Sequence, residues 1–387
     1  MISSMKTQHF TIQNIYIILS VILPVLSIYV SPIPGIDLGT ACILVFGVIM
    51  LMSSQSFHMY GLLSLILLYS FVVSIPAISG GAIEYSSSGA VLVRLMRFII
   101  LSLLMIGCGY ANYYNEQKYT KVLGVASLIV AGYAILQSIV FRFMGIKLRN
   151  IFGKERGGAV FSAALGQYED VYRPPSFFLE PSAVTYFLTP FLCYILFRSK
   201  KMNYKDFLVA AVLTIGILVS TSGQGLLVIA LCWGIWGITQ IKSRNIAGII
   251  IAALCAVLFF KNFDMEYSLS RITTEDELNA VDARSGGYDM VKELSGTALL
   301  FGNGYGNYDE TIYYSSFAEI LFCTGIIGLA LVILFYAILF IKGIRYQRVL
   351  VLASLILMLG GGIYTATYLC LYLPLLLSRG RYSDLHS

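Results

Sequence analysis

Charged residues are scarce in this chain. Of its 387 residues, 12% are Asp, Glu, Lys or Arg and 58% are apolar, whereas an ordinary globular domain carries about 25% charged residues. Apolar runs of about 20 residues recur along the whole length, and each is long enough to cross about 30 Å of hydrocarbon. The short alternating segments of an outer-membrane barrel are missing. The composition therefore predicts an all-α polytopic integral membrane protein.

Residues that bind metals or act as bases are also few. Of the three histidines, His9 and His386 lie near the ends of the chain, and His58 lies at the end of a predicted helix. The seven cysteines are isolated in apolar runs without the spacing of a metal site, which predicts small core residues. There is no HExxH, Walker or Cys/His motif, and no DxD motif near a predicted span. We therefore expect neither a metal nor a cofactor.

The apolar runs predict twelve transmembrane helices in a single transmembrane domain, residues 1–387, with no separate soluble domain. The last two spans are divided at the glycines 360–362. The spans are expected at residues 13–30, 37–54, 58–78, 90–110, 121–141, 182–198, 204–221, 224–241, 246–261, 313–341, 349–363 and 365–378.

The distribution of Lys and Arg predicts the orientation of these spans. The short connections at 31–36, 79–89 and 222–223 contain no Lys or Arg, whereas the short connections on the opposite side are basic. Cytoplasmic loops carry the excess of positive residues, so both termini are predicted to be cytoplasmic. Two long loops, 142–181 and 262–312, then lie on the outer side of the membrane. Loops of this length are usually functional.

The segment from Arg173 to Ser182, RPPSFFLEPS, lies before the sixth predicted span. Its consecutive prolines exclude a regular helix, while Pro181 suits the first position of the next helix. Arg173 beside that helix N-terminus would form an anion site suited to phosphate. Glu180 would serve instead as a base or hydrogen-bond acceptor. A capped helix with a local Arg173–Glu180 ion pair is the structural alternative.

Two arginines and one glutamate lie within predicted spans. Arg94 and Arg97 are three residues apart and share a helical face near the outer end of the fourth span. They extend to the interface, as long cationic side chains do, or they receive a lipid-linked phosphate. Glu319 is the only acid well inside a span. It is a structural partner for one of these arginines or a part of the site.

The second long loop is acidic but contains Arg271 and Arg284. These arginines are either paired with the surrounding carboxylates or directed towards a specific anion. The glycine-rich stretch at 302–307 follows no predicted strand, which excludes a dinucleotide fingerprint and favours a turn that returns the chain to the membrane.

The order of these features resembles the bacterial O-antigen polymerases, within the broader group that also contains the O-antigen ligases. The resemblance covers about residues 150–335 and depends on the ordered set, since each motif alone is weak. It is carried by Arg173 through Ser182, Ser220 to Gly225, Arg271 and Arg284, FGNGYGNY at 301–308, and Gly325-Ile326-Ile327-Gly328.

The resemblance implies a metal-independent, membrane-embedded glycosyltransferase of the GT-C type in the bacterial inner membrane. It would join oligosaccharide repeat units carried on undecaprenyl pyrophosphate at the periplasmic face. The implied partners are the lipid-linked donor and acceptor, membrane lipids and a membrane protein that regulates chain length, without nucleic acid. Catalytic roles fall to Arg173, Glu180 and Arg284, and substrate-binding roles to Arg271, Arg94, Arg97, Gln224 and Tyr314.

The chain departs from the family pattern at two places. Tyr314 and Ser315 stand where many members have a His-Asn pair, which removes a candidate base and argues against the ligase. Gln224 follows Ser222-Gly223 where members often have Ser-Arg, so Gln224 or the Arg94/Arg97 pair would replace a basic contact. The alternatives are a lipid-linked oligosaccharide flippase or other transporter, and the ligase. Nearly uncharged spans favour chemistry at the membrane surface over transport.

Overall fold

The computed structural model describes most of the chain, and nearly all of that part is helical. No strand occurs among the described residues, where the only β-type pairing is the isolated bridge between Val30 and Asp37. The described ranges are 2–31, 37–53, 61–81, 83–110, 116–148, 172–199, 202–242, 282–309, 311–361 and 366–378.

The helices follow one another along the chain with mostly short connections. The first group comprises α1 (Ile2–Leu26), α2 (Leu38–Ser53), α3 (Gly61–Ile78), α4 (Ser88–Tyr110) and α5 (Glu116–Met144). The second comprises α7 (Pro181–Phe197), α8 (Tyr204–Val219) and α9 (Gly223–Lys242). The third comprises α12 (Asp282–Lys292), α13 (Gly296–Phe301), α14 (Ser316–Lys342), α15 (Arg345–Gly360) and α16 (Ala366–Leu376).

Each predicted span that falls on described residues coincides with a helix. The ninth, 246–261, lies outside the described residues. Three described helices, α3, α5 and α14, are long and apolar enough to cross a membrane, and four shorter apolar segments accompany them in α1, α2, α7 and α9. The described part of the chain is therefore compatible with a helical membrane protein.

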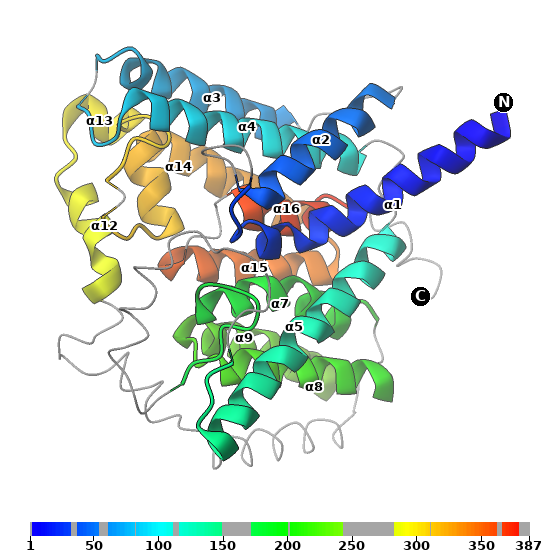
Figure 1. Ribbon diagram of the computed structural model, residues 1–387. Coiled ribbons are helices and arrows are strands. Elements are labelled where there is room, and N and C mark those ends of the chain that lie inside the picture. Colours follow the sequence, from blue (N-terminus) through cyan, green and yellow to red (C-terminus); the bar gives the residue numbers. More distant parts are fainter. Residues whose placement is uncertain are drawn as a thin grey trace.

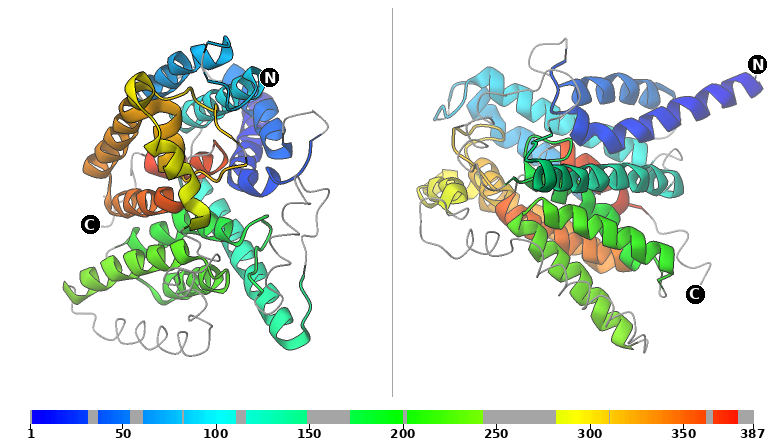
Figure 2. Two further views of the ribbon diagram at one scale, coloured as in Figure 1. Left: turned by 90° about the vertical axis from the view of Figure 1, so that its left-hand side faces the viewer. Right: turned by 60° about the horizontal axis from the view of Figure 1, so that its bottom comes forward.

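Helices α15 and α16 lie between two groups of helices (Figure 1). Helices α1 to α4 lie on one side, and α5 and α7 to α9 lie on the other; the turned views show the same separation (Figure 2). Helix α7 is central, because it packs against α5, α8, α9, α15 and α16. All its residues except Pro181 and Tyr194 are buried. A helix that is apolar on every side belongs in such a core.

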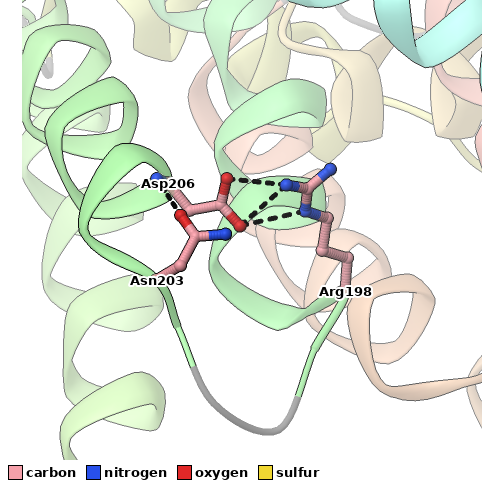
Figure 3. Close-up of polar contacts among 3 residues, drawn as sticks. All are labelled: Arg198, Asn203 and Asp206. Carbon is pink, nitrogen blue, oxygen red and sulfur yellow. Dashed lines mark hydrogen bonds and ion pairs between the residues drawn. The ribbon is translucent and has the colours of Figure 1, made fainter. Parts of the chain in front are cut away.

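The far end of α7 is fixed by an ion pair to the start of α8 (Figure 3). Arg198 Nη2 lies 2.6 Å from Asp206 Oδ1 and 2.7 Å from Oδ2, and Nε donates to Oδ2 at 3.2 Å. The Asn203 side chain caps α8 by accepting from the Asp206 backbone N–H at 2.8 Å. Two-point pairing of this kind satisfies a buried carboxylate and defines the geometry of the α7–α8 hairpin. At the opposite end of α7, residues 172–180 form an elbow that leads into the helix, and this end of the molecule is called the elbow end.

Helix α14 differs from the predicted span 313–341 because it is broken at Gly325, where φ is +66° and ψ is −171°. The loop after α13 causes the break by packing directly against it. A Cβ at Gly325 would collide with the Leu300 carbonyl, and a Cβ at Gly302 would collide with the backbone of Cys323. The loop amide of Gly304 donates to the Cys323 carbonyl at 2.9 Å, just before the break. Backbone groups left unpaired by the break thus find partners in the loop.

The second long loop contains α12 and α13 in its described part. The turn predicted at 302–307 is present, and it returns the chain to the bundle against α3, α4 and α14. Asn307 anchors the turn by accepting from the backbone N–H groups of Tyr85 and Ser86, both at 3.1 Å. The Asn307 amide also donates to the Ile83 carbonyl at 2.9 Å.

Candidate functional site

The elbow, residues 172–180, leads into α7 and is locked onto α5. Ser176 adopts a positive φ of 54°. The buried Gln137 of α5 accepts from the Ser176 N–H at 2.8 Å and donates to the Ser176 carbonyl at 3.3 Å. Ser176 Oγ also donates to the Val130 carbonyl at 2.8 Å. These bonds explain why the proline-rich segment is rigid and why its path is set by α5.

Aromatic packing reinforces the elbow on either side of these hydrogen bonds. Phe177 stacks on Tyr133 with ring centroids 4.6 Å apart, and Phe178 is buried against Phe187 of α7. Tyr172 donates to the Leu148 carbonyl at 3.0 Å. Burial, with the Tyr133 phenol nearby, raises the pKa of Tyr172 to about 12, so the phenol next to Arg173 stays neutral at physiological pH.

Arg173 connects the elbow to the turn between α8 and α9. Its Nε donates to Thr221 Oγ1 at 2.8 Å, and its Nη2 donates to the Thr221 carbonyl at 3.3 Å. Thr221 has a positive φ of 49°. Among the described residues, Ser176 and Thr221 are the two non-glycine positions with positive φ. Strained backbone of this kind costs free energy and clusters at functional sites.

Arg173 contacts the turn that precedes α9, and α7 is linked to α9 near the start of both helices. Helix α7 begins at Pro181 and α9 begins at Gly223, and Tyr186 of α7 links them by donating to Gln224 Oε1 at 2.9 Å. Each N-terminus presents unpaired N–H groups and about half a positive charge. Together with the guanidinium, this arrangement can hold an anion.

Glu180 occupies the N-cap position of α7, but its side chain makes no capping bond. It is exposed to solvent, and its Oε2 accepts from Ser182 Oγ at 3.0 Å. The hydrogen bonds of Arg173 and Glu180 thus go to Thr221 and Ser182 respectively. Glu180 remains accessible to a hydroxyl group that binds at this end.

Gly360 and Gly361, at the end of α15, pack against the Tyr186–Gln224 pair. From the sequence they were predicted only to divide two spans. A Cβ at Gly360 would collide with Gln224 Nε2, and a Cβ at Gly361 would collide with the Tyr186 hydroxyl. Glycine is therefore required for the close approach of the Tyr186–Gln224 pair. Gln224 Nε2 is buried without a hydrogen-bond partner. Three successive glycines at a helix end were the available signal for this packing.

The carbonyl groups at the end of α15 accept hydrogen bonds from α12 and from the segment that begins α14. Tyr288 of α12 donates to the Leu359 carbonyl at 2.9 Å, Tyr313 to the Gly360 carbonyl at 3.2 Å, and Ser316 Oγ to the Gly361 carbonyl at 2.7 Å. Arg284 lies one turn before Tyr288 on α12. The structure therefore brings the helix that carries Arg284 to the group formed by Tyr186, Gln224 and Gly360. Arg271 lies outside the described residues.

Arg94 is placed apart from this group and holds the 301–308 turn. Its Nη1 donates to Ser86 Oγ at 3.0 Å and to the Gly306 carbonyl, and its guanidinium lies 4.6 Å from the ring centroid of Tyr308. The arginine thus joins α4 to two segments of loop. These contacts correspond to neither expectation, extension to the interface or an open phosphate contact.

Arg97 is an ion-pair partner of Asp37. Its Nη2 lies 2.6 Å from Asp37 Oδ2, which is almost fully buried. Asp37 also caps α2, accepting from the Thr40 N–H at 2.7 Å and the Thr40 hydroxyl at 2.8 Å. A substrate phosphate would have to compete with this carboxylate for Arg97.

Tyr314 lies in an aromatic cluster with Tyr308, the ring that Arg94 contacts, and with Phe322 of α14. Its ring approaches Gly287 of α12, and its hydroxyl is buried without a hydrogen-bond partner. No group of three or more His, Cys, Asp or Glu able to hold a metal occurs among the described residues.

In comparisons with known proteins, no family model and no curated protein matches this chain.

Proposed function

We propose that this protein is a polymerase of O-antigen or a related surface polysaccharide. It would join oligosaccharide repeat units carried on undecaprenyl pyrophosphate at the periplasmic face of the inner membrane. Twelve spans with both termini in the cytoplasm belong to this proposal, since they direct the elbow end towards the periplasm. The observation that carries it is the contact of Arg173 with the turn that precedes α9, at the end of the bundle where α7 and α9 are linked near their N-termini.

The chemistry of a lipid pyrophosphate suits this end of the molecule. Pyrophosphate is a good leaving group, so the main requirement is to stabilise the negative charge that develops as its bond to the sugar breaks. Arg173 is oriented by Thr221, and two helix N-termini add to its field. Arg284 is proposed as the opposite wall because α12 is bound to the end of α15 through Tyr288.

The acceptor would be a sugar hydroxyl of the incoming unit. Holding that hydroxyl next to the anomeric carbon supplies much of the rate enhancement in a transfer of this kind. Glu180 is exposed beside the start of α7 and can accept a hydrogen bond from it. Gln224 and Tyr314 are proposed to bind the sugars, Arg271 to assist with the donor, and Arg94 and Arg97 to contribute less because each has protein partners.

The experiment that tests the proposal deletes the gene in its own strain and complements it with variants. Loss of a polymerase leaves a single repeat unit on the core of the lipopolysaccharide, whereas loss of all repeat units indicates the flippase or the ligase. Arg173→Ala and Arg284→Ala should each give single units. Removal of a charged hydrogen-bond donor costs roughly 1.5–3 kcal/mol, which predicts that Arg173→Ala binds undecaprenyl pyrophosphate about 10-fold to 150-fold more weakly.

Matched controls are available close to both arginines. Lys147 is exposed at the end of α5, and Lys292 is exposed on α12, where it pairs with Asp289. Lys147→Ala and Lys292→Ala remove a positive charge from the same surface and should preserve long chains. If both arginine variants also preserve long chains while present in the membrane, the site assignment is wrong.

A further inference from the structure

Glu319 is the one buried carboxylate of the described side chains whose role the site above leaves open. Three carboxylates are buried there: those of Asp37, Asp206 and Glu319. Asp37 is paired with Arg97, and Asp206 is paired with Arg198. The Asp37 carboxylate also caps α2, and the backbone N–H of Asp206 donates to Asn203, which caps α8.

The Glu319 carboxylate has no comparable partners. No hydrogen bond or ion pair to it occurs among the described residues, although the side chain is buried, with 8% of the residue exposed. Arg94 is close enough for its charge to act on Glu319, but Arg94 Nη1 donates to Ser86 and Gly306 instead. Its oxygen atoms are not among the fully buried polar atoms that lack a partner in the described part of the chain, so they keep some access from outside the packed side chains.

The position of Glu319 suits an encounter with substrate. It lies on the arm of α14 before the break at Gly325, one turn after Ser316 and so about 4.5 Å further along the helix axis. Ser316 is bound to Gly361, which touches Tyr186. Ser316 and Glu319 share a helical face. Glu319 therefore lies on the face of α14 that Ser316 directs to the end of α15, within range of the charge of Arg94.

We propose that Glu319 takes the proton from the acceptor hydroxyl, an inference that rests on the function proposed above. The acceptor oxygen forms a bond to the anomeric carbon of the donor sugar. The bond from that carbon to the pyrophosphate oxygen breaks, and its electron pair leaves with the lipid pyrophosphate. The hydroxyl proton passes to the Glu319 carboxylate and then to water. Because none of the described residues donates to its oxygen atoms, they are available to the incoming hydroxyl.

Glu180 is the other carboxylate at this end, and it is a weaker choice for this step. It is exposed to water and already accepts from Ser182 at 3.0 Å. We assign it to orienting the hydroxyl, whereas Glu319 accepts the proton.

The test uses the full-length protein in the deletion strain and in nanodiscs. Glu319→Gln keeps the shape but removes the charge, and it should lower the rate of chain extension by about 100-fold to 10,000-fold, the usual contribution of a general base. It should still bind undecaprenyl pyrophosphate as the unaltered protein does. Glu319→Asp should retain part of the activity. Long chains from Glu319→Gln would overturn the assignment.

A double variant separates proton transfer from charge balance. If Glu319 served only to balance the charge of Arg94, then Arg94→Gln combined with Glu319→Gln would restore neutrality and long chains, and the proposal would be overturned. The proposal requires the double variant to stay inactive while present in the membrane. The same double variant decides the question if Glu319→Gln alone does not accumulate. If the unaltered protein neither binds undecaprenyl pyrophosphate nor extends chains, the polymerase function itself is wrong.

Discussion

The hydrogen bonds of Gln137 offer a direct test of how the elbow is held. Gln137 is fully buried, and its amide makes three bonds: to the Ser176 N–H at 2.8 Å, the Ser176 carbonyl at 3.3 Å and the Leu148 carbonyl at 3.2 Å. Gln137→Leu removes all three at similar volume. A buried donor left unpaired costs about 1–3 kcal/mol. The positive φ of Ser176 adds to the tendency of the segment to open.

This free energy converts into a measurable rate of exchange. If the elbow opens locally, an increase of about 1–3 kcal/mol in its opening equilibrium raises amide hydrogen exchange about 5-fold to 150-fold. The measurement is hydrogen–deuterium exchange of peptides covering residues 172–180 in the full-length protein. Exchange in α8 and α15 should not change, because the Gln137 amide does not bond to either.

Two further variants make the result specific. Gln137→Glu places a buried carboxyl group against the Ser176 and Leu148 carbonyls, to which it cannot donate both bonds, so exchange of the elbow should also rise. Ile139→Leu alters an exposed residue on the same helix and should change nothing. Unchanged exchange at 176–178 in Gln137→Leu would refute the reasoning. Because Arg173 lies three residues before Ser176, the same variant should also weaken the binding of undecaprenyl pyrophosphate.

Two other predictions concern stability. Gly302→Ala and Gly325→Ala place a methyl group against backbone at positive φ. Each should therefore lower the free energy of unfolding by about 1–3 kcal/mol or more. The control Gly132→Ala, whose methyl group meets nothing within 4 Å, should be neutral or slightly stabilising in thermal unfolding. Asp206→Asn weakens the pair with Arg198 and should lower the melting temperature. Because that pair is at the far end of α7, binding of undecaprenyl pyrophosphate should not change, and a large loss of binding would contradict the separation of the two ends.

The helices could be predicted from the sequence because an apolar run of span length is a local signal. The start of α7 was placed at Pro181 for the same reason, since proline marks the first position of a helix. The two short helices α12 and α13 have no such run. Helix α12 is mostly polar and is held by tertiary contacts such as Tyr288 to the Leu359 carbonyl, which no local pattern reveals.

The arginines show where sequence reasoning about the site ended. Arg94 and Arg97 share a helical face, so the sequence suggested one role for both. Their partners come from different parts of the chain, Gly306 for one and Asp37 for the other. Asp37 was not singled out from the sequence, and its pairing with a residue sixty positions away depends on how α2 packs on α4.

The break in α14 changes what the acidic residue within it means. Counted as one span, residues 313–341 would place Glu319 in apolar surroundings, where a charge is costly and needs a partner. The break at Gly325 separates Glu319 from the longer part of the helix. The arm before the break is bound to Gly361 and to the 302–304 loop, so backbone polar groups lie on one side of it and an aromatic cluster lies on another. A carboxylate in such a place can meet a substrate hydroxyl at the elbow end, whereas one in an unbroken span would meet only neighbouring helices.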